Sequence, residues 1–213
     1  MRIEELGPPD ADHSTGLILH WRDQLLFAVQ PADQWHDTAA GRLAYFVGIG
    51  GHLEVGESWI EAVRREAQEE ASLAIDLLSP AETWLLREGE TSQDITDALT
   101  WTDEPRPLFV WSATFRFGSP PNEQTRHFCN AVFEAVIPDD VQPRPAAEMP
   151  AILALDAAQL RQTATCPISL GTLLDGGALI WESEPVPRTA LVAPRGTAQW
   201  YDVWLQECNV DPL

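Results

Sequence analysis

The segment from Gly50 to Leu73 constrains the fold most strongly, because a glycine-rich turn passes directly into a helix with a clear start signal. Ser58, followed three residues later by Glu61, forms a capping box. Beyond this cap, apolar residues recur at helical spacing and define one face; they are Ile60, Val63, Ala67, Ala71 and Ala74. The segment therefore predicts an amphipathic helix that begins just after Ser58.

Three carboxylates lie beside this apolar face. Glu66, Glu69 and Glu70 stand at positions i, i+3 and i+4, within an arc of roughly 100° on one side of the helix. Like charges at this spacing cost a few tenths of a kcal/mol per pair in an isolated helix. A hard divalent cation between them would offset the repulsion, since Mg²⁺ and Mn²⁺ prefer carboxylate oxygens. The two interpretations are a metal site and a solvated acidic face.

The whole segment resembles the Nudix box, G-x5-E-x7-R-E-U-x-E-E-x-G-U, where U is an apolar residue. The residues in register are Gly51, Glu57, Arg65, Glu66, Ala67, Glu69, Glu70 and Leu73. Ser72 stands where the family has glycine. A left-handed helix end at this position costs serine on the order of 1 kcal/mol; alternatively, the helix continues through residues 73–75. On this pattern the chain is identified as a member of the Nudix family.

The resemblance implies a fold and a site. The fold would be α/β (α+β), a Nudix-type α/β/α sandwich with a mixed central sheet, over roughly residues 14–162. The cofactor would be Mg²⁺ or Mn²⁺. Arg65 would hold one glutamate in its orientation, and Glu57 would lie near the metal. The metal ligands implied are Glu66, Glu69, Glu70 and the backbone carbonyl of Gly50.

The general base is open at this level, because relatives use either a box glutamate or one on a later loop. Glu69 is the first candidate. Glu123 is the second, since it precedes a strand, where relatives often carry such a residue; the competing interpretation is a solvated loop carboxylate. Glu104 is a further candidate, and Glu134 and Glu148 are weaker ones, since Glu134 lies within a predicted strand and Glu148 precedes one.

The rest of the chain reads as strands, a few helices and polar loops. Residues 1–14 predict a polar lead-in, and residues 31–41 and 87–107 predict loops. Residues 118–123 predict the turn of a hairpin. The expected strands cover 15–21, 24–30, 43–47, 74–78, 82–86, 108–117, 125–137 and 152–155; helices follow near Asp156 and over 168–174. We expect a Nudix domain over residues 1–182 and a C-terminal extension over 183–213 that packs on it.

Composition restricts the partners. Acidic residues outnumber basic ones 33 to 13, giving a formal net charge of −20, which argues against nucleic acid and anionic membrane surfaces. No membrane span or signal peptide is expected. The cysteines, Cys129, Cys166 and Cys208, are odd in number and far apart, which favours a reducing cytoplasm. Nudix proteins are often dimeric, so the resemblance also implies a homodimer, with a second copy of this chain as a candidate partner.

The leading functional prediction is a metal-dependent pyrophosphohydrolase acting on nucleoside-diphosphate-linked substrates. A nucleoside triphosphatase that releases pyrophosphate is the alternative within the class. A Nudix domain that binds a nucleotide as a sensor is the alternative outside it, although the complete set of box carboxylates favours the enzyme. Trp35, Tyr45 and Phe46 precede the box, where relatives often line the base pocket, but core packing is the commoner role of strand aromatics.

Overall fold

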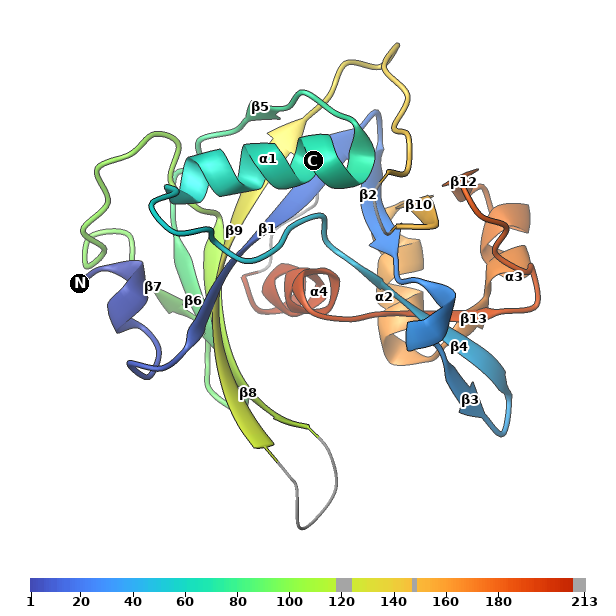
Figure 1. Cartoon of the computed structure of the whole chain (residues 1–213), viewed down its shortest axis with the longest axis horizontal. Helices are drawn as coiled ribbons and strands as arrows, with labels where there is room; N and C mark the ends of the chain where they lie inside the picture. Colours follow the sequence, from blue (N-terminus) through green and yellow to red (C-terminus); the bar gives the residue numbers. More distant parts are fainter. Residues whose placement is uncertain (118–123, 147–148, 209–213) are drawn as a thin grey trace.

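The computed structural model describes residues 1–117, 124–146 and 149–208. Within these residues a single sheet contains thirteen strands, of which nine follow the order β11-β13-β4-β2-β1-β9-β8-β6-β7 (Figure 1). The strands are β1 (Asp12–Trp21), β2 (Gln24–Val29), β3 (His36–Thr38), β4 (Gly41–Val47), β5 (Asp76–Leu77), β6 (Trp84–Arg87), β7 (Gln93–Asp94), β8 (Phe109–Phe117), β9 (Gln124–Val136), β10 (Ala151–Leu155), β11 (Ile168–Ser169), β12 (Leu179–Glu182) and β13 (Leu191–Pro194). The helices are η1 (Ile3–Glu5), η2 (Ala32–Gln34), α1 (Trp59–Ala71), α2 (Ala157–Thr165), α3 (Leu170–Asp175) and α4 (Thr197–Glu207).

The sheet is mixed at its centre. β1 pairs in parallel with β9 and antiparallel with β2, while β8 and β9 form an antiparallel pair. The turn expected between β8 and β9, at residues 118–123, lies outside the described residues. The observed architecture of a mixed sheet with helices agrees with the predicted α/β/α fold class.

Two apolar cores lie on the two faces of the sheet. Leu17 and Leu19 on β1 face the core beneath α1, whereas Ile18 between them faces the core that contains residues of α4. This alternation follows from the two-residue period of side chains along a strand. The sheet therefore separates α1 from α4, and in Figure 1 the two helices lie above and below the middle of β1.

Three segments that were expected to be irregular are structured. Ile3 and Leu6 are 1% and 4% exposed and belong to the core beneath α1, so residues 1–14 are not a polar lead-in. Residues 31–41, expected to be a loop, contain η2 and β3, which pairs with β4. Residues 87–107, also expected to be a loop, contain β7, which pairs with β6, and Ile95, which is 4% exposed. All three cases depend on contacts with distant or neighbouring strands that local composition does not encode.

The C-terminal segment joins the same sheet. β13 pairs in parallel with β4, and α4 follows it after Arg195 and Gly196. The division of the chain at residue 182 remains a prediction. None of the helices in the described part of the chain is both long and apolar enough to cross a membrane.

Candidate active site

The start of α1 follows the predicted capping box. The Ser58 hydroxyl accepts a hydrogen bond from the Glu61 amide at 3.2 Å, and the Ser58 amide donates to the Glu61 carboxylate at 2.8 Å. These two bonds satisfy backbone donors that the first helical turn leaves free. The local sequence thus fixes where the helix begins and which face it presents to the sheet.

The end of α1 resolves the two expectations for Ser72. Ser72 has φ 55° and ψ 37°, the left-handed conformation, and the helix ends at Ala71 rather than continuing through residues 73–75. The amides of Ser72 and Leu73 donate back to the carbonyls of Gln68 and Ala67 at 3.1 and 3.2 Å. The serine therefore occupies the conformation that the family glycine would serve.

The glycine turn before α1 lies directly against β1. The amides of Thr15 and Leu17 donate to the carbonyls of Gly51 and Ile49, both at 2.8 Å. Gly50 has φ 149°, and a side chain at this position would collide with the Thr15 carbonyl. Its amide donates to Glu70 Oε2 at 3.0 Å, which connects the turn to the last turn of α1.

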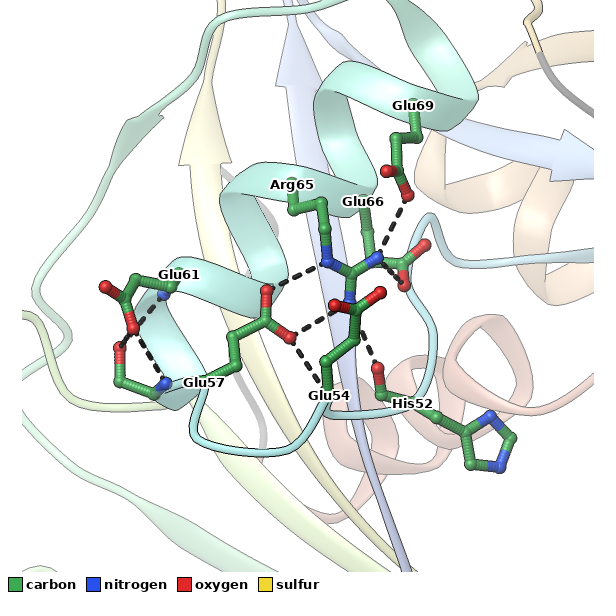
Figure 2. Close-up of polar contacts among 8 residues, drawn as sticks. His52, Glu54, Glu57, Glu61, Arg65, Glu66 and Glu69 are labelled. Carbon is green, nitrogen blue, oxygen red and sulfur yellow. Dashed lines mark hydrogen bonds and ion pairs between the residues drawn. The ribbon is translucent and has the colours of Figure 1, made fainter.

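Arg65 lies at the centre of a group of carboxylates (Figure 2). Its guanidinium binds Glu57 through two hydrogen bonds of 2.8 and 3.0 Å, Glu66 at 2.7 Å and Glu69 at 2.9 Å. It also donates to the His52 carbonyl at 3.1 Å. One glutamate partner was expected and three are present, because Glu57 reaches Arg65 from the turn while the other two lie on the same helix. The hydrogen bonds from Arg65 hold the pKa of Glu57 below its usual value, and those with Glu57 raise the pKa of Arg65.

Two of the predicted metal ligands are buried. Glu66 and Glu70 are each 9% exposed, whereas the side chain of Glu69 is 54% exposed. Burial raises the pKa of Glu70 to about 7, and the nearby carboxylates of Glu66 and Glu69 add to this shift against the hydrogen bond from Gly50. A carboxyl group with such a pKa lies in a position where a positive charge would favour its ionised form.

The donor chemistry of these residues fits a hard divalent cation. The Glu66 carboxylate lies against Gly51 so closely that a Cβ on Gly51 would collide with it, so this glycine makes room for the buried carboxylate, while the absence of a side chain at Gly50 lets the turn approach the Thr15 backbone of β1. Across the described residues, no group of three or more His, Cys, Asp or Glu side chains is already arranged to hold a metal ion. Figure 2 shows that the carboxylates of Glu66 and Glu69 both contact the Arg65 guanidinium.

The later candidates for a general base are dispersed. Glu134 on β9 is buried and lies 2.7 Å from His20 Nε2, and Glu104 is exposed and accepts a hydrogen bond from Ser79 at 3.3 Å. Glu123 and Glu148 lie outside the described residues. Of the candidates that are described, Glu69 alone belongs to the Arg65 group.

The three aromatic residues that precede the box have different surroundings. Phe46 is fully buried and packs on Phe27 with 5.3 Å between ring centroids. Trp35 is half-buried, and its indole N–H donates to the Gln30 carbonyl at 2.7 Å. Tyr45 borders a cavity, and the Arg195 guanidinium lies over its ring at 5.2 Å from the centroid. Core packing is therefore confirmed for Phe46 but not for Tyr45.

Sequence reasoning missed Arg195. It follows β13, more than a hundred residues after the box, and the next helix begins at Thr197 beside Gly48, where a Cβ on the glycine would lie 2.7 Å from Thr197 Cβ. The local signal for this segment is Pro194-Arg195-Gly196 before an apolar helical pattern. That signal predicts a helix start but not the surface against which it packs.

A sequence model described as the NUDIX domain matches residues 13–165. The match covers well over half of the chain and includes every residue of the glycine turn and of α1. The chain belongs to the NUDIX family and is a Nudix-type hydrolase. The predicted family, fold class and enzyme class are confirmed at this level.

Several solved structures match the chain at low similarity. The MutT protein from Methanosarcina mazei Go1 is 14% identical, with 74% of this chain and 85% of that chain covered and a TM-score of 0.43. The E. coli dihydroneopterin triphosphate pyrophosphohydrolase is 16% identical, with 70% and 84% covered and a TM-score of 0.42. A C. elegans Ap4A hydrolase binary complex is 13% identical, with 73% and 88% covered and a TM-score of 0.39. No curated protein matches the chain. Likenesses at these scores add nothing to the family assignment.

Proposed function

We propose that this protein hydrolyses a phosphoanhydride bond in a nucleoside-diphosphate-linked or nucleoside triphosphate substrate, with Mg²⁺ or Mn²⁺ as cofactor and water attacking phosphorus. The observation that carries the proposal is the concentration of carboxylates around Arg65, next to a buried Glu70 that is fastened to Gly50. Arg65 supplies one positive charge against four carboxylates, so a bound cation would offset the repulsion that remains among them.

The residues that would hold the cation are Glu66, Glu69, Glu70 and the carbonyl of Gly50. When bound, the cation would neutralise charge on the diphosphate and make water easier to deprotonate. Arg65 would orient Glu57 and Glu66, since its planar guanidinium binds Glu57 through two parallel hydrogen bonds and Glu66 through a third. Glu57 would lie beside the cation site and keep the turn close to α1.

Glu69 would act as the general base. Its carboxylate is the most exposed of the three on α1, and it touches Arg65 through Oε2 at 2.9 Å. A carboxylate that is accessible to water and close to the scissile phosphate suits the removal of a proton. Glu123 remains the second candidate, as the sequence indicated.

The substrate is proposed to be a small molecule rather than a nucleic acid. With a formal net charge of −20, the protein repels a polyanion at long range, whereas a local cation and Arg65 can still receive one diphosphate. The same charge argues against anionic membranes. A cytoplasmic location remains the expectation from the unpaired cysteines.

The test is a panel of nucleotide sugars, dinucleotides and nucleoside triphosphates in millimolar Mg²⁺ or Mn²⁺, with wild type, Glu70→Gln and Glu61→Gln. Glu61→Gln removes the same charge from the same helix, and glutamine preserves a capping box. We expect cleavage that requires metal, falls by orders of magnitude in Glu70→Gln and persists in Glu61→Gln. Nucleotide binding without cleavage by the wild type would favour the sensor, and equal activity of the two variants would remove Glu70 from the site.

A further inference from the structure

A cavity of about 370 Å³ lies where the C-terminal segment meets the sheet, on the side of α4. Its lining includes Gln30, Val47, Trp111, Phe128, Arg195 and Gly196. Small-molecule sites in proteins have volumes of about 300–1,000 Å³ and combine apolar walls with a few polar groups. Arg195 and Gly196 lie outside residues 13–165, which the family model matches, so part of this wall comes from the C-terminal segment.

The cavity adjoins the candidate active site. Val47 is three residues before Gly50, whose amide binds Glu70, and three residues span at most about 11 Å of chain. Thr197, which directly follows Gly196, lies against Gly48 in the same turn. The cavity wall therefore lies close to the glycine turn, and a phosphate chain attached to a ligand in the cavity could extend along this turn toward the carboxylates of α1.

Two buried polar atoms of cavity residues lack a hydrogen-bond partner within the described part of the chain. They are the indole Nε1 of Trp111, a residue that is only 5% exposed, and the side-chain oxygen of Gln30. Buried polar atoms are nearly always hydrogen-bonded, and each exception calls for an explanation. One atom is a donor and the other is an acceptor, which together suit the edge of a planar heterocycle.

One arginine side chain and the positive end of one helix lie at the same wall. The Arg195 guanidinium lies over the Tyr45 ring, and no acidic side chain among the described residues forms an ion pair with it. Gly196 begins α4 without a side chain that caps the first turn, so backbone amides at the positive end of the helix remain free of a side-chain acceptor. In a protein with 33 acidic residues, this wall is suited to an anion.

We propose that this cavity binds the nucleoside end of the substrate. The heterocycle packs against the aromatic walls at Trp111 and Phe128, the Trp111 N–H and the Gln30 amide contact its edge, and Arg195 with the start of α4 binds the phosphate nearest the nucleoside. The inference rests on the proposed function for the position of the scissile bond, but nucleotide binding itself does not require the metal or the chemistry.

The experiment measures binding of nucleoside monophosphates by isothermal titration calorimetry in EDTA, with the full chain, so that no hydrolysis occurs. Arg195→Gln removes the charge, and Trp111→Phe removes the indole N–H while keeping an aromatic ring. The matched control is Arg22→Gln: Arg22, like Arg195, lies over an aromatic ring, in this case that of Trp21 at 4.1 Å, and it is not part of this cavity. Ribose 5-phosphate serves as the ligand without a base.

We expect Arg195→Gln to raise the Kd of nucleoside monophosphates and of ribose 5-phosphate by about tenfold or more, as loss of a charged hydrogen bond implies. Trp111→Phe should raise the Kd of the nucleotides and leave that of ribose 5-phosphate unchanged. Should Trp111→Phe fail to fold, the Kd values of Arg195→Gln alone test the inference, since Arg195 is half-buried at the surface and its replacement leaves the core intact.

Two outcomes would overturn the inference. The first is that no nucleoside monophosphate binds the wild type, even if metal-dependent hydrolysis is present. The second is that Arg22→Gln weakens binding as much as Arg195→Gln does. Conversely, nucleotide binding with the expected variant effects but no hydrolysis of any diphosphate would support the inference while the proposed function fails.

Discussion

The buried carboxylate of Glu70 accepts a hydrogen bond from the backbone amide of Gly50, with 3.0 Å between Oε2 and the amide nitrogen. This bond joins the last turn of α1 to the glycine turn that precedes the helix by nine residues. Burial raises the pKa of Glu70 to about 7, so the group that fastens the two halves of the site lies between its neutral and charged forms near neutral pH.

The pH dependence of stability in EDTA should reveal this carboxyl group. Its pKa is about 7 in the folded protein and 4.5 without the shift, so between these values the folded state binds more protons than the unfolded state. The stability that the protonated group confers is therefore present below about pH 4.5 and is lost as the pH rises through about 7.

The glutamine side chain in the variant Glu70→Gln cannot ionise, and its amide oxygen can still accept the hydrogen bond from the Gly50 amide. The melting temperature of the variant should rise relative to wild type as the pH increases from about 5 to about 8, with a difference in free energy of a few kcal/mol at most. Thermal unfolding at a series of pH values measures it, with Glu61→Gln as the control. A difference in melting temperature between Glu70→Gln and wild type that stays constant from about pH 5 to about pH 8 would contradict the raised pKa of Glu70.

Arg65→Lys should reduce kcat by about tenfold or more, while the fold is retained. A lysine ammonium cannot reproduce the two parallel bonds to Glu57 and at the same time bind Glu66 and Glu69. Arg64→Lys is the control, since Arg64 is exposed on the same helix. Steady-state kinetics on whichever substrate is cleaved gives the comparison, and similar kcat values for the two variants would show that the geometry around Arg65 is not needed.

The sequence predicted those parts of the site that depend on neighbouring residues. Ser58 and Glu61 form the expected cap, and Val63, Ala67 and Ala71 face the core because helical spacing requires it. Strand positions near the box were also predictable, since β-branched and aromatic runs ended at turn residues. The family resemblance added Gly50 as a metal ligand through its carbonyl, but neither it nor any local rule predicted the bond from the Gly50 amide to Glu70.

Contacts between distant segments could not be predicted. Neighbours such as Tyr45 and Phe46 must point to opposite faces of a strand. The burial of each side chain depends on what covers its face: Arg195, after β13, lies over Tyr45, whereas Phe46 packs in the core. The burial of Ile3 likewise depends on a strand more than a hundred residues later, where Cys129 Sγ lies 3.5 Å from the Ile3 carbonyl. Such pairings carry no periodic signal within a short segment.

Ser72→Gly should stabilise the protein by about 1 kcal/mol. Ser72 has φ 55° and ψ 37°, a conformation that glycine adopts without the steric cost borne by a side chain. Ser72→Ala is the control, because alanine keeps the cost and removes the hydroxyl. Urea unfolding of the three proteins tests this, and an equal gain from alanine would show that the hydroxyl, rather than the backbone, is the source of the effect.

Thiol labelling should distinguish the cysteines by burial. Cys129 is 0% exposed beneath the N-terminal segment, and burial raises its pKa to about 12, whereas Cys166 is exposed. Because the thiolate is the reactive form, iodoacetamide at about pH 8 should modify Cys166 in the native protein and Cys129 only after unfolding.

The variant Ile3→Ala tests whether the N-terminal segment provides this protection. Ile3 is 1% exposed and packs in the core beneath α1, so its truncation should loosen residues 3–6 and increase the rate at which Cys129 is labelled, with the rate at Cys166 unchanged. Mass spectrometry of tryptic peptides over a time course gives both rates from one sample. Labelling of native Cys129 as fast as Cys166 would mean that the segment before β1 does not cover Cys129, and the placement of Ile3 in the core beneath α1 would then be wrong.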